Sequence, residues 1–385
     1  GGDEAAGRRA ILDRFDANFD VSVGTLIAGG RKLRDARFRG ALRQGTLDLD
    51  TVEAEAVAGG PLRLDGTIRN VATPAPTLDV NLTWQNLRPR AALQWLNVAD
   101  GGVPAGWPTV NVSGQLAGTP GELRVNLALQ ALDGLLTANG TMARAAGGAR
   151  PTADLRVALQ HDSLRRLLGA FTALPRLTAD PGAVDLAARV RSTDTGIEAR
   201  DLNGALGPVQ LTGGIDADLD GARPHVAVNL DAGALPLAAF APAADGSRNG
   251  GGAGDWSAAP LGLEALRRVD GNLNLRADAL KLGGMAPLED AQIEATLADG
   301  VLTLNTATAT WLGGAARVTG TLNAAATPTL ETEFGLADVD AAAVQPAVDG
   351  MRVGGPVSLD AALSARGRSE RALIETLTGE GEIEG

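Results

Sequence analysis

Apolar and polar residues alternate along most of this chain, and the alternation predicts β-strands. Clear examples are Leu78, Val80, Leu82 and Trp84, and later Leu302 and Leu304. A period of two places one set of side chains on a single face, so each strand is expected to have one apolar face. Asx-Gly pairs predict tight hairpin turns between antiparallel neighbours, because glycine supplies the positive φ such turns require. These pairs are Asp65-Gly66, Asn139-Gly140, Asp220-Gly221, Asp270-Gly271 and Asp299-Gly300.

A second period follows four of the predicted strands. Leucine and alanine recur there at helical spacing, which predicts short helices over residues 88–96, 163–171, 235–240 and 338–348. We interpret each helix as a crossover from one group of antiparallel strands to the next.

The chain also repeats itself. Residues 16–70 align with residues 270–324 from end to end, with one compensated single-residue slip. Asp16 aligns with Asp270, Leu47 with Leu302, and Gly59-Gly60 with Gly313-Gly314. Self-similarity of this length predicts one structural unit used twice in an array.

Leu, Val and Ala dominate the apolar positions, and the sequence has no Tyr, 6 Phe and 5 Trp. So few bulky aromatics fill a sandwich interior poorly. We therefore expect a mostly β protein, an elongated and curved antiparallel sheet that forms a repeating β-groove with short crossover helices. An array of β-sandwiches is the alternative, because alternation alone does not show what covers the apolar face.

A glycine-rich stretch suggests how the chain is organised. Residues 241–255 include Gly250-Gly251-Gly252 and are expected to form a linker or loop. It would separate a β-groove segment, residues 1–240 with the first copy, from a second segment, residues 256–385 with the second copy. The last residues read as part of a strand, so we expect this second segment to be truncated at the C-terminus.

Composition and charge exclude several classes of function. The net charge is −12 without any basic run, which argues against nucleic acid as a partner. The chain has no Cys, and its two histidines, His161 and His225, lie far apart in sequence. We find no Gly-x-Ser-x-Gly motif and no spacing typical of metal ligands. The sequence therefore predicts no enzyme activity, no cofactor and no metal site, and no apolar run reaches the ~20 residues of a membrane-spanning helix.

An ordered set of short segments resembles the C-terminal region of AsmA-like proteins. The set starts with Trp256-Ser257 and continues with Asn272-Leu273-Asn274-Leu275, Leu280-Lys281-Leu282-Gly283-Gly284, Leu288-Glu289-Asp290-Ala291, Val301-Leu302-Thr303-Leu304, Gly320-Thr321-Leu322 and Leu377-Thr378-Gly379-Glu380-Gly381. The resemblance is close over residues 256–385 and weaker over residues 16–70, where it follows from the internal repeat. Between residues 71 and 241 only the rhythm of strands agrees.

The resemblance implies a protein of the Gram-negative envelope. AsmA-like proteins have an N-terminal inner-membrane anchor, absent from this sequence, and a long periplasmic β-groove similar to that of chorein-type lipid bridges. The implied role is outer-membrane biogenesis and phospholipid transport between the inner and outer membranes. A non-catalytic scaffold or regulator of outer-membrane protein assembly is the alternative, with outer-membrane assembly proteins as partners.

An acyl chain that leaves a bilayer loses roughly 0.8 kcal/mol per exposed CH₂, so an aqueous gap requires a continuous apolar track. We expect the apolar face to bind phospholipid acyl chains. The residues expected to line it are Leu26, Phe38, Leu42, Leu47, Leu49, Leu64 and Ile68 in the first copy, and Leu273, Leu275, Leu280, Leu282, Ile293, Leu297, Leu302, Leu304, Val318 and Leu322 in the second. The alternative is that these residues pack against a covering layer as ordinary core.

Overall fold

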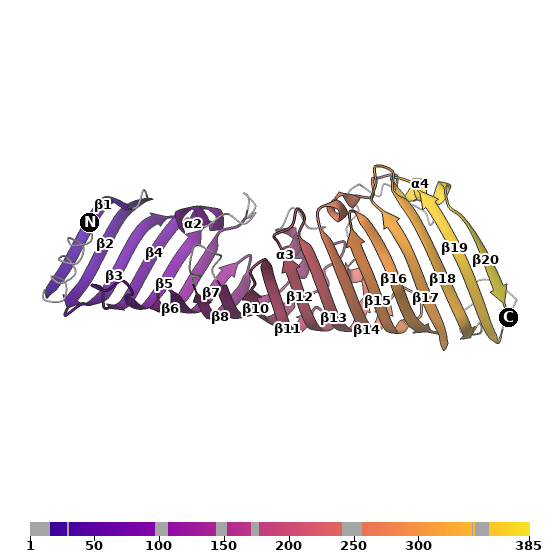
Figure 1. Ribbon diagram of the computed structural model, residues 1–385, viewed down its shortest axis with the longest axis horizontal. Helices are drawn as coiled ribbons and strands as arrows, with labels where there is room; N and C mark the ends of the chain where they lie inside the picture. The colour runs from indigo at the N-terminus through magenta and orange to yellow at the C-terminus, as the bar shows by residue number, and fades with distance from the viewer. Residues whose placement is uncertain are drawn as a thin grey trace. The chain divides into compact units, whose positions relative to one another are not determined.

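The computed structural model describes residues 16–28, 31–96, 107–143, 152–170, 177–240, 256–340, 342 and 354–385. Strands dominate these ranges, as the alternation predicts (Figure 1). The chain divides into two compact units. Unit 1 comprises residues 1–174 and 183–194, and unit 2 comprises residues 175–182 and 195–385.

Unit 1 is an open antiparallel sheet of long strands. Its strands are β1 (Ala17–Ala28), β2 (Arg31–Arg43), β3 (Thr46–Val57), β4 (Gly60–Arg69), β5 (Thr77–Leu87), β6 (Val110–Thr119), β7 (Glu122–Ala131), β8 (Gly134–Ala143), β9 (Thr152–His161) and β10 (Val184–Ser192). Each strand pairs antiparallel with the next one in sequence. Two helices interrupt this meander, α2 (Pro89–Leu96) and α3 (Leu164–Gly169).

Unit 2 repeats this architecture with one difference. Its strands are β11 (Gly196–Leu206), β12 (Val209–Asp218), β13 (His225–Pro236), β14 (Asp270–Lys281), β15 (Leu288–Ala298), β16 (Val301–Trp311), β17 (Gly314–Asn323), β18 (Thr329–Asp340), β19 (Pro356–Arg366) and β20 (Thr378–Glu384). Consecutive strands pair antiparallel except β13 and β14, which are parallel, with Leu230 beside Leu275. The prediction of a curved and mainly antiparallel sheet is confirmed, and this parallel pair is the exception to it.

The parallel pair changes the interpretation of the helices as crossovers. Helices α2 and α3 each connect antiparallel neighbours, so neither of them carries the chain across the sheet. The connection between β13 and β14 is different: because these strands are parallel, it must carry the chain from the end of β13 back to the opposite end of the sheet, where β14 starts. Its described parts include the 3₁₀ turns η2 (Leu237–Phe240) and η3 (Leu263–Arg267).

The third and fourth predicted helices differ from the structure. Leu235 and Pro236 still belong to β13, so the helical turn begins only at Leu237. Asp338, Val339 and Asp340 end β18, and apart from Ala342 the remaining residues of that predicted helix lie outside the described ranges. The predicted linker, residues 241–255, also lies outside them, and the strands on either side of it, β13 and β14, pair directly.

Three of the five Asx-Gly pairs lie inside strands, contrary to the prediction of hairpin turns. Asp65-Gly66 lies in β4, Asn139-Gly140 in β8 and Asp270-Gly271 at the start of β14. Gly66 has φ +136°, and a Cβ added there would lie 2.2 Å from the carbonyl oxygen of Asp79 on the neighbouring strand. Glycine therefore permits close approach of two backbones in the sheet, a requirement that looks like a turn signal in sequence.

The two copies of the sequence repeat share their register. Leu47 lies opposite Ile68 in the first copy, and Leu302 lies opposite Leu322 in the second. The copies also share an irregularity, after Leu49 in β3 and after Leu304 in β16. In addition, Asp35 and Asp290 are both in the left-handed region, at φ 49° and 51°.

Candidate functional site: the apolar face of each unit

Aliphatic side chains form rows across the strands on one face of each unit. Residues that lie directly opposite each other on neighbouring strands have Cβ atoms about 4.5–5.5 Å apart, so a row of such pairs is continuous. In unit 1 one row consists of Leu42, Leu47, Ile68 and Leu78. In unit 2 the equivalent row consists of Leu297, Leu302, Leu322 and Leu330. We call these two the outer apolar rows.

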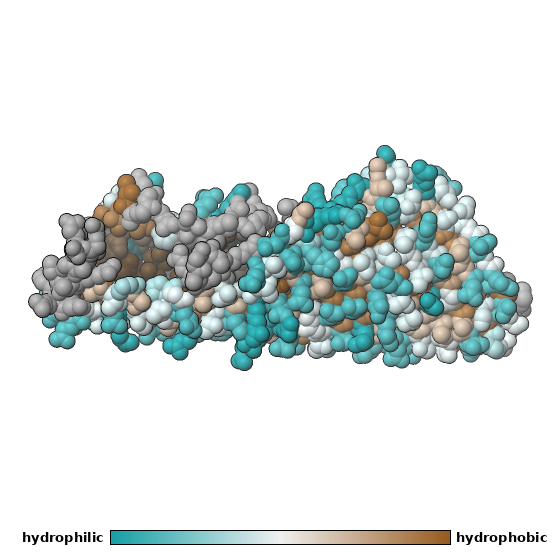
Figure 2. All heavy atoms as spheres, in the orientation of Figure 1, coloured by the Kyte–Doolittle hydropathy of each residue, from teal (hydrophilic) through white to brown (hydrophobic). Residues whose placement is uncertain are grey.

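Further rows lie beside them on the same face. Phe38, Val52, Leu64 and Leu82 are successive cross-strand neighbours in unit 1. Leu275, Ile293, Ala307, Val318 and Phe334 are successive neighbours in unit 2. The apolar face is therefore several rows wide in each unit, and in unit 1 the space-filling view shows hydrophobic residues inside the hollow above the strands (Figure 2).

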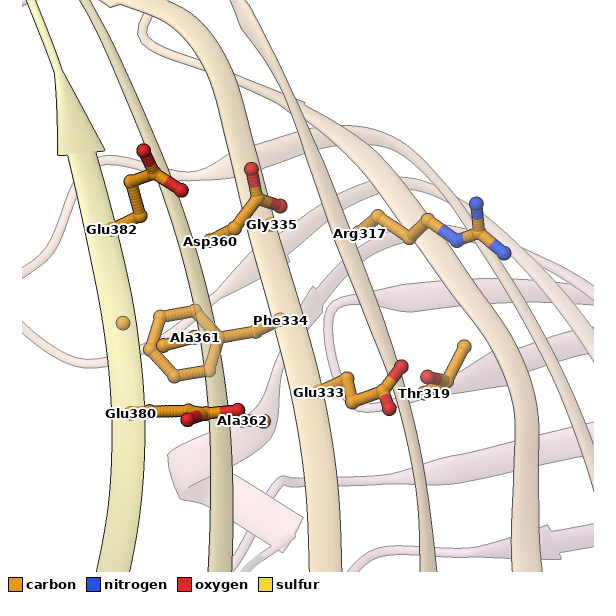
Figure 3. A pocket seen from close by; sticks show the side chains of 11 residues that line it. Arg317, Thr319, Glu333, Phe334, Gly335, Asp360, Ala361, Ala362, Glu380 and Glu382 are labelled. Carbon is orange, nitrogen blue, oxygen red and sulfur yellow. The ribbon is translucent and has the colours of Figure 1, made fainter.

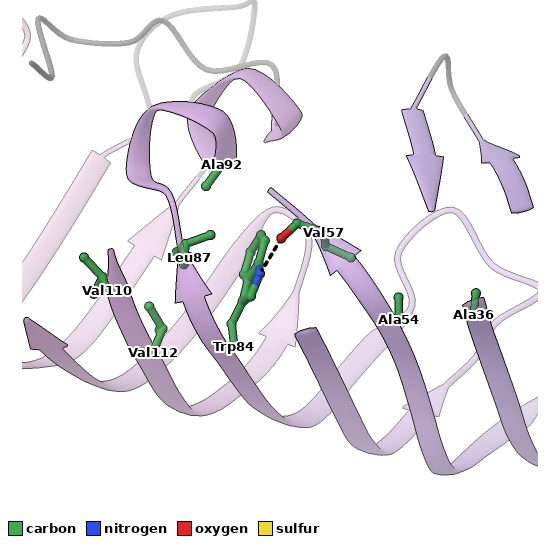
Figure 4. Packing of buried hydrophobic residues seen from close by; sticks show 8 residues of the cluster. All are labelled: Ala36, Ala54, Val57, Trp84, Leu87, Ala92, Val110 and Val112. Carbon is green, nitrogen blue, oxygen red and sulfur yellow. Dashed lines mark hydrogen bonds between the residues drawn. The ribbon is translucent and has the colours of Figure 1, made fainter. Parts of the chain in front are cut away.

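Part of this face in unit 1 is an ordinary buried core. Helix α2 places Ala92 over the cluster that contains Trp84 (Figure 4). Trp95 of the same helix packs against this cluster, and its ring meets that of Trp84 edge to face at 6.0 Å. The indole N–H of Trp84 donates to the carbonyl oxygen of Val57 at 2.9 Å, and Val57 itself has no exposed surface. The strands in Figure 4 bend around this cluster, so α2 covers a concave surface.

Unit 2 has a smaller buried cluster next to η2. Val209, Leu211, Ala232, Ala277, Leu280 and Ala291 are its buried members. Leu235, Leu275, Ile293 and Phe240 pack against it while remaining partly accessible. As with α2 in unit 1, the segment that packs over the cluster is short and directly follows a strand: η2 follows β13.

The predicted lining residues fall into four groups. Leu280 is buried in the cluster of unit 2, and Leu282 lies beyond the end of β14 with 37% of its surface exposed. Phe38, Leu275 and Ile293 are half-buried and border a cluster. The remaining twelve are half-buried and belong to neither cluster: Leu26, Leu42, Leu47, Leu49, Leu64, Ile68, Leu273, Leu297, Leu302, Leu304, Val318 and Leu322.

Part of the apolar face is therefore ordinary core, and the lining of an acyl-chain path by the rest of it stays a prediction. The rows under α2 and η2 are covered core, whereas the outer apolar rows lie outside the clusters. Leu78, Leu330 and Phe334 also belong to these rows but were not predicted to line them, because they lie beyond the aligned copies. Strand register, which extends each row by one strand, identifies them.

The opposite face carries charged pairs across the strands. Asp20 binds Arg37 and Arg39, and these two guanidinium groups hold the pKa of Asp20 below its usual value. Asp154 accepts from Arg189 and Arg191, which lowers its pKa to about 2. In unit 2, Arg276 pairs with Asp231 on the neighbouring strand. One face of each unit is therefore solvated, as expected of an antiparallel sheet.

A surface hollow of about 590 Å³ lies on strands β17 to β20 (Figure 3). Its polar lining includes Arg317, Glu333, Asp360, Glu380 and Glu382. These side chains alternate along the strands with Phe334 and Ala361, which belong to the apolar face. The hollow is therefore a feature of the solvated face and does not belong to the apolar rows.

The two histidines lie in unrelated environments. His161 is buried, with Nε2 2.8 Å from the carbonyl oxygen of Leu132 and Nδ1 accepting from the backbone N–H of Ser163 at 2.9 Å. His225 is exposed and contacts Asn272. Among the described residues, no group of His, Asp and Glu has the arrangement of a metal site. No helix in the described ranges is long and apolar enough to cross a membrane.

Comparisons of the chain with models of protein families, with curated proteins and with solved structures find no match.

Proposed function

We propose that this protein shields phospholipid acyl chains on its apolar face and supports their transport between the inner and outer membranes of a Gram-negative envelope. The supporting observation is the outer apolar row of each unit, in which aliphatic side chains follow one another across neighbouring strands without belonging to a buried cluster. The resemblance of residues 256–385 to AsmA-like proteins supports a periplasmic location and an inner-membrane anchor.

The physical basis is the cost of hydrating an acyl chain. Each methylene that stays on the apolar face avoids about 0.8 kcal/mol of exposure to water. The rows consist of leucine, valine, isoleucine, alanine and phenylalanine, so no polar side chain within them holds a ligand at one position. A fatty tail can slide along such a surface, and a transport path requires this. The opposite face carries charged side chains that water solvates, so the sheet can present its apolar face to lipid while the other face stays hydrated.

Photocrosslinking tests the proposal directly. A benzophenone amino acid at Leu302 or Leu304 is expected to capture co-purified phospholipid, identified by mass spectrometry. The matched control is Thr303, which lies between them and points to the opposite face. Val112 serves as a second control, because it is buried in the cluster under α2. Absence of lipid adducts at both leucines would contradict the proposal and favour a scaffold of outer-membrane protein assembly.

A further inference from the structure

The segment before β14 runs across the ends of the strands on one side of unit 2, which we call the edge of this unit. Its residues 256–269, which we call the edge segment, contact the connection between β19 and β20 at three points. The N–H of Arg371 donates to the carbonyl oxygen of Ser257, the N–H of Leu261 donates to that of Arg368, and Pro260 forms an isolated bridge with Ser369. The edge segment ends at Asp270, whose N–H donates to the carbonyl oxygen of Pro224. Backbone hydrogen bonds thus fix it along the ends of several strands.

Two arginines on this edge are held by main-chain carbonyls of a single loop. Nε of Arg267 donates to the carbonyl oxygen of Ala324, and Nε of Arg368 donates to that of Ala326 at 2.8 Å. Ala324 and Ala326 are two residues apart in the connection between β17 and β18, so their Cα atoms lie within about 7 Å. The stem of Arg267 also packs against Gly300, with Cγ 3.0 Å from the position of a Cβ added there.

This anchoring uses one donor of each guanidinium group and leaves four. Neither arginine forms an ion pair with a carboxylate in the described part of the chain. Many other arginines of this protein do so, including Arg189 with Asp154 and Arg223 with Asp270. Arg267 and Arg368 are therefore oriented by the fold while their terminal N–H groups remain available.

A hollow of about 310 Å³ lies between the two arginines. The edge segment lines it with residues 260–264, and the loop after β17 lines it with Ala325, Ala326 and Pro328. Glu264 is the one carboxylate among the lining residues, so two cations face one anion. Planar guanidinium groups bind the oxygens of phosphate through paired N–H donors, and they are preferred to lysine for that geometry.

We propose that Arg267 and Arg368 bind the phosphate group of a phospholipid whose tails lie on the apolar face of unit 2. This inference rests on the proposed function and adds a headgroup site to it. The site is next to the outer apolar row, because the loop that holds the arginines connects Leu322 on β17 to Leu330 on β18. A lipid can therefore place its tails on this row and its phosphate at the edge.

Isothermal titration with three probes tests the site on the full chain. The probes are inorganic phosphate, the short-chain phospholipid dihexanoyl-phosphatidylglycerol, and dioctanoylglycerol, which has tails but no phosphate. The double variant Arg267→Gln/Arg368→Gln is expected to weaken binding of the phospholipid about tenfold or more, because it removes charge-assisted hydrogen bonds to the phosphate. Binding of dioctanoylglycerol is expected to stay unchanged. Arg317→Gln, an exposed arginine on the solvated face, is the matched control.

The outcomes separate this inference from the proposed function. Equal affinity of the double variant and the wild type for the phospholipid overturns the headgroup site, while binding of dioctanoylglycerol would still support the apolar face. Loss of affinity for inorganic phosphate without any change for the phospholipid assigns the site to free phosphate and overturns the link to lipid. Glu264→Gln provides an independent check, since removal of the opposing carboxylate should strengthen phospholipid binding. Circular dichroism of each variant establishes that it is folded.

Discussion

The carboxylate of Asp270 accepts a hydrogen bond from the backbone N–H of Asp299 at 2.9 Å and so connects the start of β14 to the turn after β15. The first copy of the repeat has the same connection, because Asp16 accepts from the N–H of Gln44 at 3.2 Å. In both copies the turn also accepts a hydrogen bond from just beyond the fourth strand: the N–H of Val71 donates to the carbonyl oxygen of Gly45, and the N–H of Ala324 donates to that of Gly300. The repeat therefore conserves the turn's hydrogen bonds as well as the hydrophobic rows.

Removal of this carboxylate is expected to destabilise each copy. Asp16→Ala should lower the free energy of unfolding by about 1 kcal/mol, because the N–H of Gln44 loses its partner at an exposed turn. Asp270→Ala should cost more, since Asp270 also pairs with Arg223. Denaturant unfolding measures both values. Asp50→Ala is the control, and an equal loss in all three variants would show that the turn connection does not matter.

The glycines within strands give a second prediction. Gly66→Ala places a Cβ 2.2 Å from a main-chain oxygen of the neighbouring strand, in a φ region that alanine avoids. The strands must move apart or the residue must change conformation, which should cost about 2–3 kcal/mol. Gly24→Ala in β1 is the matched control, because no atom lies within 4 Å of its added Cβ. If both variants unfold at the same denaturant concentration, close strand approach at Gly66 is not required.

These glycines also show how far sequence patterns reach. Alternation identified the strands and their apolar face, since a period of two is a local property of the chain. The Asx-Gly pairs misled at Gly66 and Gly140, because a turn and a close contact between strands both select glycine. Only the second requirement depends on the partner strand, which no local pattern reveals. The parallel pairing of β13 with β14 escaped prediction for the same reason.

The residues of the apolar face could be predicted from the sequence, but which of them are covered by another segment of the chain could not. Leu47 and Leu280 were both predicted to line the apolar face, yet one lies in an outer apolar row and the other in a buried cluster. The difference comes from short segments such as η2, which fold over one end of the strands. Likewise, the two arginines of the proposed headgroup site, Arg267 and Arg368, come from the edge segment and the β19–β20 connection, which lie far apart in sequence.

The cluster under α2 should behave as core. Trp84→Phe keeps most of the ring but removes the donor that binds Val57, leaving a buried carbonyl oxygen without that partner. We expect a loss of about 1–3 kcal/mol in the free energy of unfolding. Trp256→Phe, at a tryptophan that is half exposed, should change it little. Unchanged stability in Trp84→Phe would mean that water reaches the carbonyl oxygen of Val57 and that the cluster under α2 is not a closed core.

His161 is expected to be a structural residue. Its ring joins the turn at Leu132 to the N–H of Ser163, and Ser163 caps α3 through the N–H of Arg166. His161→Ala removes the side chain that bonds to the carbonyl oxygen of Leu132 and to the N–H of Ser163, and should cost about 2 kcal/mol or more. His225→Ala, at an exposed position, should be nearly neutral. Differential scanning fluorimetry of both variants provides the comparison, and similar melting temperatures would contradict this role.

The two arginines beside Asp154 predict that the stability of the protein depends on pH in the acidic range. Arg189 is the main cause of the lowered pKa, about 2 in the folded protein against 3.8 for an unperturbed aspartate. Because the folded-state pKa is depressed, the contribution of Asp154 is complete above pH ~4 and is lost as the pH falls towards ~2. Asp154→Asn lacks this titration, so the difference in denaturation midpoint between wild type and variant should shrink over that interval. A difference that stays constant from pH 5 to pH 2 would show that solvent screens the pair completely.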